Sequence, residues 1–137
     1  MIVIDTNILA YGALAQSEPG LRQQAQAVLN GKDRILVPSL WRHEFLNILS
    51  GYARRGFLSV SAAETYWYQA VATIQDVEAE VDMSRALELS VELGVTAYDA
   101  QFLALAEGAK AILVTEDRRL RIAAGPRAMS MQEYLAT

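Results

Sequence analysis

The sequence predicts an α/β protein with a mostly parallel central sheet, and three observations lead to that prediction. Short apolar runs alternate with longer segments that have the periodicity of amphipathic helices. The alternation is not interrupted by a linker, an internal repeat or a low-complexity tract. A chain of 137 residues that is 53% hydrophobic and 20% charged is long enough for one compact core. We therefore expect a single domain over residues 1–137.

Each expected element follows from a local pattern. The expected strands lie at residues 2–4, 35–37, 77–81, 112–114 and 128–131, of which the last has the weakest pattern. The expected helices lie at residues 7–15, 20–30, 39–54, 61–75, 83–93 and 97–107. Pro38 and Ser39 open the third helix, Gly94 closes the fifth, and Thr96 with Asp99 forms a candidate capping box at the start of the sixth.

Composition limits the classes of function. The absence of cysteine excludes disulfides and zinc–thiolate sites, so a metal would be held by oxygen ligands or by the single histidine, His43. The N-terminus has no basic leader, and no apolar run is long enough for a membrane span, so we expect a cytoplasmic protein. The formal net charge of −4 argues against indiscriminate binding to nucleic acid. Arginines at 54–55 and 118–127 form either local phosphate-binding patches or ordinary solvated helix ends.

Acidic residues follow two of the expected strands. Asp5 comes directly after the strand at 2–4, and Glu116 and Asp117 lie two and three positions after the end of the strand at 112–114. Parallel strands end at the same edge of a sheet, where ligands of open α/β sheets bind. If the two strands are neighbours, these acids meet. The alternative for Asp5 and Asp117 is a simple helix N-cap, and nothing within the second stretch decides between Glu116 and Asp117.

Two further acids lie on helix faces that are otherwise apolar. A helical wheel places Glu44 inside the apolar arc of its helix, whereas His43 and Asn47 fall toward the polar side. An unpaired buried carboxylate is costly, so Glu44 needs a partner or a cation, unless it escapes at the edge of the core or bonds an arginine. Asp99 starts a helix that is apolar on nearly every side, where it caps the helix, faces the sheet edge, or does both.

Bringing these four carboxylates together requires positive charge among them. At about 4 Å and an effective dielectric of about 20, each pair would repel by roughly 4 kcal/mol. A cluster made only of oxygen ligands favours Mg²⁺ or Mn²⁺ over zinc. Such ions usually serve phosphoryl chemistry.

Four stretches of the chain also carry a family resemblance. They are "IVIDTNILAY", "VPSLWRHEFLNIL", "LGVTAYDAQFLALAEG" and "ILVTEDRRL", in that order between residues 2 and 120. With these motifs the chain resembles the PIN-domain ribonucleases, and within them the VapC-type toxins of toxin–antitoxin pairs.

The resemblance implies a three-layer α/β/α fold and an endoribonuclease whose acidic site binds one or two Mg²⁺ or Mn²⁺ ions. It also implies an RNA substrate, a cognate antitoxin protein and a homodimer. The residues that it assigns to the metal site are Asp5, Glu44, Asp99 and Asp117.

The same resemblance gives supporting roles to other residues. Thr6 and Asn7 belong to the first motif, in which the asparagine often orients the aspartate or a water molecule. Thr115 matches a hydroxyl two residues before the last acid, and this spacing selects Asp117 and makes Glu116 the variable position. The extra carboxylate of Glu116 is a departure from the family pattern.

Residues outside the four acids complete the expectations. Arg118 and Arg119 are candidates for binding phosphates of the substrate. Trp67 shares a face with apolar residues and is expected in the core, while Tyr68 turns aside toward a dimer or partner surface, and His43 is expected on the surface.

Three alternatives to a toxin nuclease were open. One is a catalytically silent PIN-like binding module, and another is a free-standing PIN nuclease without an antitoxin. The third, a phosphatase of the haloacid-dehalogenase type, requires an aspartate two positions after Asp5, where this chain has Asn7.

Overall fold

The computed structural model describes all 137 residues and contains one five-stranded sheet. The strands are β1 (Ile2–Ile4), β2 (Ile35–Pro38), β3 (Glu78–Ala79), β4 (Ile112–Val114) and β5 (Ala128–Met129). Their order in the sheet is β3-β2-β1-β4-β5, and every pairing is parallel. The predicted α/β class with a parallel sheet is confirmed.

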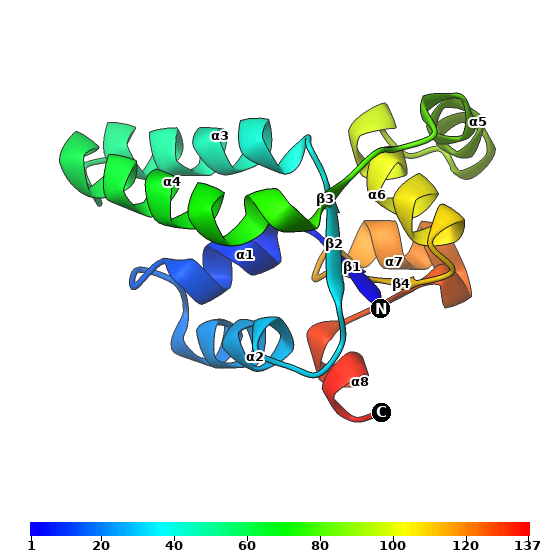
Figure 1. Ribbon diagram of the computed structural model, residues 1–137, viewed down its shortest axis with the longest axis horizontal. Coiled ribbons are helices and arrows are strands. Elements are labelled where there is room, and N and C mark those ends of the chain that lie inside the picture. The colour runs from blue at the N-terminus through cyan, green and yellow to red at the C-terminus, as the bar shows by residue number, and fades with distance from the viewer.

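Helices cover both faces of this sheet. They are α1 (Thr6–Ala13), α2 (Pro19–Leu29), α3 (Trp41–Arg54), α4 (Val60–Ile74), α5 (Met83–Leu93), α6 (Ala97–Gly108), α7 (Arg118–Ala124) and α8 (Met131–Leu135). Figure 1 shows α1 to α4 on one side of the strands and α5 to α7 on the other. This is the expected three-layer α/β/α arrangement.

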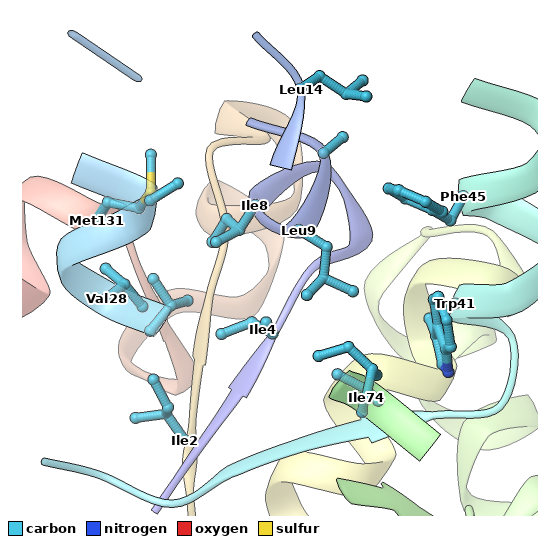
Figure 2. Packing of buried hydrophobic residues seen from close by; sticks show 14 of the residues in the cluster. Ile2, Ile4, Ile8, Leu9, Leu14, Val28, Trp41, Phe45, Ile74 and Met131 are labelled. Carbon is cyan, nitrogen blue, oxygen red and sulfur yellow. The ribbon is translucent and has the colours of Figure 1, made fainter. Parts of the chain in front are cut away.

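The alternation of side chains along the strands separates two hydrophobic cores. In β1, Ile2 and Ile4 belong to the core beneath α1 to α4, whereas Val3 belongs to the core beneath α5 to α7. Figure 2 shows part of the first core, with Trp41 and Phe45 coming from α3 and Leu9 from α1. Because both faces of the strands are covered, the strand sequences are continuously apolar.

Surface and core predictions on the long helices also hold. Trp67 packs against the first core, with its ring 5.9 Å from that of Trp41. Tyr68 is 70% exposed, and His43 lies on the surface. No helix combines the length and the apolar character that a bilayer span requires.

The structure shortens two predicted strands and adds two helices. The strand predicted at 77–81 is reduced to Glu78–Ala79, because a 3₁₀ turn occupies Gln75–Val77. The strand predicted at 128–131 ends at Met129, since Ser130 caps a helix. The short helices α7 and α8 were not among the predicted helices.

Candidate active site

Two of the predicted acids meet where the strand order changes direction. The sheet begins in the middle at β1, extends one way to β2 and β3, and extends the other way to β4 and β5. Ile4 pairs with Val114, and the N–H of Asp5 donates to the carbonyl of Val114 at 3.1 Å. Asp5 and Asp117 therefore leave neighbouring strands at the switch point of the sheet, where open α/β sheets bind ligands.

A buried threonine links these two acids. Thr115 is fully buried, and its hydroxyl donates to Oδ2 of Asp5 at 2.7 Å. The same hydroxyl accepts from the N–H of Asp117 at 3.1 Å. Thr115 therefore fixes the Asp5 side chain and also the backbone that presents Asp117.

Asp117 combines capping with a place in the site. It is the N-cap of α7, and its Oδ1 accepts from the N–H of Leu120 at 3.1 Å. Asp5 occupies the corresponding position before α1, but its side chain makes no capping hydrogen bond. The N-cap alternative thus describes one oxygen of Asp117, whereas at Asp5 the backbone amides of Thr6 and Asn7 only help to lower a pKa that burial raises.

Glu44 reaches the site from the first turn of α3. The helix starts just after β2, and burial of Trp41, Phe45 and Leu49 turns Glu44 toward the carboxyl edge of the sheet. The hydroxyl of Thr6, the residue after Asp5, donates to Oε1 of Glu44 at 2.7 Å. The hydrogen-bond partner of the Glu44 carboxylate is therefore a threonine and not an arginine.

Asp99 comes from the first turn of α6, on the opposite side of the sheet from α3. Thr96 caps this helix by accepting from the N–H of Asp99 at 3.1 Å. The reciprocal bond of a capping box, from the Thr96 N–H to the Asp99 carboxylate, is not formed. Burial and the charges of Asp5 and Asp117 raise the pKa of the Asp99 carboxyl, while the Thr96 hydroxyl lowers it.

The electrostatics show that the acids act on one another. Burial raises the pKa of Asp5, the Thr115 hydrogen bond opposes this, and the charge of Asp117 raises it further. Burial also raises the pKa of Glu44, with added repulsion from Asp5 and Asp99. The pKa of Asp99 is raised by burial and then by Asp5 and Asp117. No lysine or arginine lowers the pKa of any of these three carboxyls.

The donor chemistry of this cluster suits Mg²⁺ or Mn²⁺, which prefer oxygen ligands. Side-chain hydroxyls hold one oxygen each of Asp5 and Glu44, and the N–H of Leu120 holds one oxygen of Asp117. As the side chains stand, no three acidic groups are arranged so that they could hold an ion. An ion would therefore have to draw these carboxylates together.

Glu116 has a different environment from its neighbour. Its Oε1 accepts a hydrogen bond, at 2.7 Å, from the backbone N–H of Met131, which is the first residue of α8. That N–H is one of the donors that a helix start leaves unpaired. Glu116 is thus engaged in holding α8, although its charge also acts on the nearby phenol of Tyr11.

The predicted phosphate-binding arginines lie beside the site. Arg118 and Arg119 are exposed in the first turn of α7, directly after Asp117, and neither forms an ion pair. Asn7 is exposed at the start of α1. The seven residues expected from the four motifs all lie at the same edge of the sheet: Asp5, Thr6, Asn7, Glu44, Asp99, Thr115 and Asp117.

Sequence reasoning missed two residues at this edge. Tyr11 is half-buried, and burial followed by the charges of Asp5 and Glu116 raises the pKa of its phenol. Arg121 donates from Nη1 to the carbonyl of Thr115 at 2.8 Å and so supports the loop below the acids. Arg121 follows Asp117 by four residues, and that helical spacing was the available signal.

Comparison with known proteins gives a family and a fold. The model of the PIN domain family matches residues 2–126. Ribonuclease VapC3 of Pyrobaculum aerophilum is 34% identical over 123 residues, which cover 87% of this chain and 91% of VapC3. Exonuclease VapC9 of the same organism is 29% identical over 89 residues, covering 65% of this chain and 66% of VapC9.

Solved structures agree with this grouping. A protein from Pyrobaculum aerophilum matches with a TM-score of 0.75 at 25% identity, over 98% of this chain and 93% of that one. A toxin–antitoxin complex from Klebsiella pneumoniae contains a chain with the same fold, with a TM-score of 0.67 at 20% identity over 96% of this chain and 98% of that one. The family match across residues 2–126 and the relative that is 34% identical over most of the chain show that this protein belongs to the PIN domain family, with VapC proteins among its relatives.

Proposed function

We propose that this protein is a ribonuclease that hydrolyses RNA phosphodiester bonds with the help of Mg²⁺ or Mn²⁺. Asp5, Glu44, Asp99 and Asp117 would hold one or two of these ions. The observation behind this proposal is that the topology and the hydroxyls of Thr115 and Thr6 bring these acids to one edge of the sheet. Burial and then mutual repulsion raise the pKa of three of them, and no basic side chain compensates. The relative VapC3, whose name describes a ribonuclease, supports the choice of substrate.

The residues of the chain have distinct parts in this proposal. Thr115 and Thr6 each hold one oxygen of a carboxylate and so orient Asp5 and Glu44. Arg118 and Arg119, without acidic partners, bind phosphates next to the bond that is cut. A divalent ion held by these acids would supply positive charge for the phosphate oxygens and would lower the pKa of a bound water.

The test is cleavage of structured and unstructured RNAs in the presence of Mg²⁺ or Mn²⁺, and in EDTA. We expect cleavage with the ions, none in EDTA, and none with Asp5→Ala. Asp5→Asn is the matched variant, because its side-chain oxygen still accepts the Thr115 hydrogen bond while the charge is lost. Cleavage that persists in EDTA or in both Asp5 variants would refute the metal-dependent mechanism.

The position of the cut needs a separate experiment, because the relative VapC9 is named an exonuclease. We propose internal cleavage, in which the enzyme does not need to bind either end of the RNA. A circular RNA without ends, incubated with Mn²⁺, should be opened and then degraded. If the circle survives while the linear form of the same sequence is degraded from one end, the enzyme is an exonuclease.

We further propose that the protein is the toxin of a toxin–antitoxin pair and forms a homodimer. A chain of the same fold occurs in a toxin–antitoxin complex. Exposed apolar side chains on α3 and α4, at Leu46, Val60 and Tyr68, offer a surface for protein contact. A neighbouring gene for a small DNA-binding protein, and a particle mass of twice 15.1 kDa in solution, are the expected findings.

A further inference from the structure

A row of side chains leads away from the acidic site along α3. Glu44, Asn47, Gly51 and Arg55 follow one another at spacings of three or four residues and so share one face of the helix. The hollow on this face has a volume of about 350 Å³ and begins one turn beyond Glu44. It is lined by Asn47, Ile48, Gly51, Tyr52, Arg54 and Arg55. At about 1.5 Å per residue, Glu44 and Arg55 are roughly 17 Å apart along the axis.

The far end of this row is an aromatic cluster around an arginine. The guanidinium carbon of Arg55 lies 5.3 Å from the ring centre of Tyr52 and 5.6 Å from that of Phe57. The two rings meet edge to face at 6.2 Å. Phe57 is nevertheless 60% exposed, so one side of its ring remains open to solvent. Two rings therefore hold Arg55 in place while the cluster faces solvent.

Arg55 also keeps free hydrogen-bond donors. Its Nε donates to the carbonyl of Gly51 at 3.1 Å, as expected for a basic residue at a helix C-terminus. That bond leaves both Nη groups without a partner, because neither Arg54 nor Arg55 is in an ion pair in this acidic protein. An ordered guanidinium with free Nη groups matches the geometry of a phosphate.

The cluster is continuous with the acidic site. Tyr11 of α1 packs against the same core as Tyr52 of α3. The phenol of Tyr11 is close enough to Asp5, Glu116 and Tyr52 for all three to act on it electrostatically. A strand that enters at the acids and follows α3 therefore meets Tyr11 first and the Tyr52–Arg55–Phe57 cluster last.

We propose that this face of α3 binds the single-stranded RNA that flanks the bond being cut. Arg55 pairs with a backbone phosphate, and Phe57 stacks on an unpaired base. The proposal rests on the proposed ribonuclease function but names a separate set of residues for substrate binding. Pairing of phosphate with a preordered arginine and stacking on an aromatic ring require no particular base, so the surface favours unstructured RNA over duplex.

The test is binding of a fluorescently labelled unstructured RNA in EDTA, where no cleavage is expected. Arg55→Ala and Phe57→Ala should each weaken binding by roughly tenfold. Arg55→Ala should also reduce the salt dependence of log K by about 0.7, the value for one phosphate contact in a single strand. Arg34→Ala and Val91→Ala are the controls, because they remove an exposed arginine before β2 and an exposed apolar side chain from α5. Both controls should bind as the unchanged protein does.

Thermal unfolding of each variant shows whether a loss of binding reflects loss of the fold. Binding that is unchanged in Arg55→Ala and Phe57→Ala, or equally weakened in the controls, would overturn the proposal. The proposal would also be overturned if the protein without substitutions bound no RNA. If the protein binds RNA through Arg55 and Phe57 but cuts none with Mn²⁺, the surface is supported and the ribonuclease function fails. With an active enzyme, Arg55→Ala should raise KM and leave kcat nearly unchanged.

Discussion

At the residue scale, two adjacent carboxylates have separate tasks. Glu116 accepts the first N–H of α8, whereas Asp117 caps α7 and acts electrostatically on Asp5 and Asp99. Each side chain points toward the helix whose N-terminus it binds, Glu116 toward α8 and Asp117 toward α7. Sequence spacing from Thr115 selected Asp117, and the structure gives a physical reason why Glu116 is engaged elsewhere.

This division predicts opposite results for two conservative substitutions. Asp117→Asn keeps an oxygen for the Leu120 N–H but removes the charge, so we expect metal-dependent RNA cleavage to be abolished. Glu116→Gln keeps an oxygen for the Met131 N–H and should retain most of the activity. Glu116→Ala should lower the free energy of unfolding by about 1 kcal/mol, because the N–H loses its partner. Cleavage rates and denaturant unfolding check these outcomes, and the reverse order of activities would assign the site to Glu116.

The buried hydroxyl of Thr115 offers a second residue-scale prediction. Thr115→Val keeps the shape but removes the donor to Asp5 and the acceptor for the Asp117 N–H. Since that hydrogen bond lowers the pKa of Asp5, its loss should move the acidic limb of the pH–activity profile to higher pH. The free energy of unfolding should fall by about 1–3 kcal/mol. Thr115→Ser, which keeps the hydroxyl, is the control and should leave the profile in place.

At the element scale, glycine positions on two helices predict opposite effects of the same substitution. Gly51 lies inside α3, and a Cβ there would meet only Nη2 of Arg55, at an ordinary 3.7 Å. Gly51→Ala should therefore stabilise the protein by about 0.5–1 kcal/mol. Gly94 ends α5 with a φ of +66°, so Gly94→Ala should destabilise it by about 1–2 kcal/mol. Equal signs in thermal unfolding would contradict this explanation.

The elements that sequence reasoning found are those with long, regular patterns. The six helices from α1 to α6 lie where the periodicity placed them, and every end agrees to within two residues. The short helix α8 was missed although Ser130 and Glu133 form a complete capping box, because the preceding apolar residues were interpreted as one strand. The helix α7 has only seven residues, too few for a periodic pattern to stand out.

At the scale of the whole molecule, the meeting of the acids at one edge of the sheet was predictable because topology converts local positions into proximity. Asp5 and Asp117 follow neighbouring parallel strands, while Glu44 and Asp99 lie in the first turns of helices on opposite faces. The contacts that orient these acids were not predictable. The bonds from Thr6 to Glu44 and from Thr115 to Asp5 join residues 38 and 110 positions apart, and they depend on tertiary packing.

The acidic cluster should make the stability of the whole protein depend on pH and on divalent ions. Because the folded state raises the pKa of Asp5, Glu44 and Asp99, it binds protons more tightly than the unfolded state. The resulting stabilisation is present below the unfolded pKa values, near 4, and is lost as the pH rises through the folded values. Asp33 and Glu133 have lowered pKa values and act in the opposite sense, with stability lost as the pH falls below about 4.

Thermal unfolding in EDTA should therefore show a decline in Tm from mildly acidic to neutral pH, and Mn²⁺ should reverse that decline by supplying the missing positive charge. The Mn²⁺ effect should be larger at neutral pH, where protons no longer compete for the carboxylates. Asp5→Asn removes one of the repelling charges, so it should raise Tm in EDTA at neutral pH and reduce the response to Mn²⁺. Glu64→Gln, an exposed acid on α4, is the control and should change neither. A protein whose Tm in EDTA is unaffected by Asp5→Asn, or whose Asp5→Asn variant responds fully to Mn²⁺, would show that these carboxylates do not form one electrostatic unit.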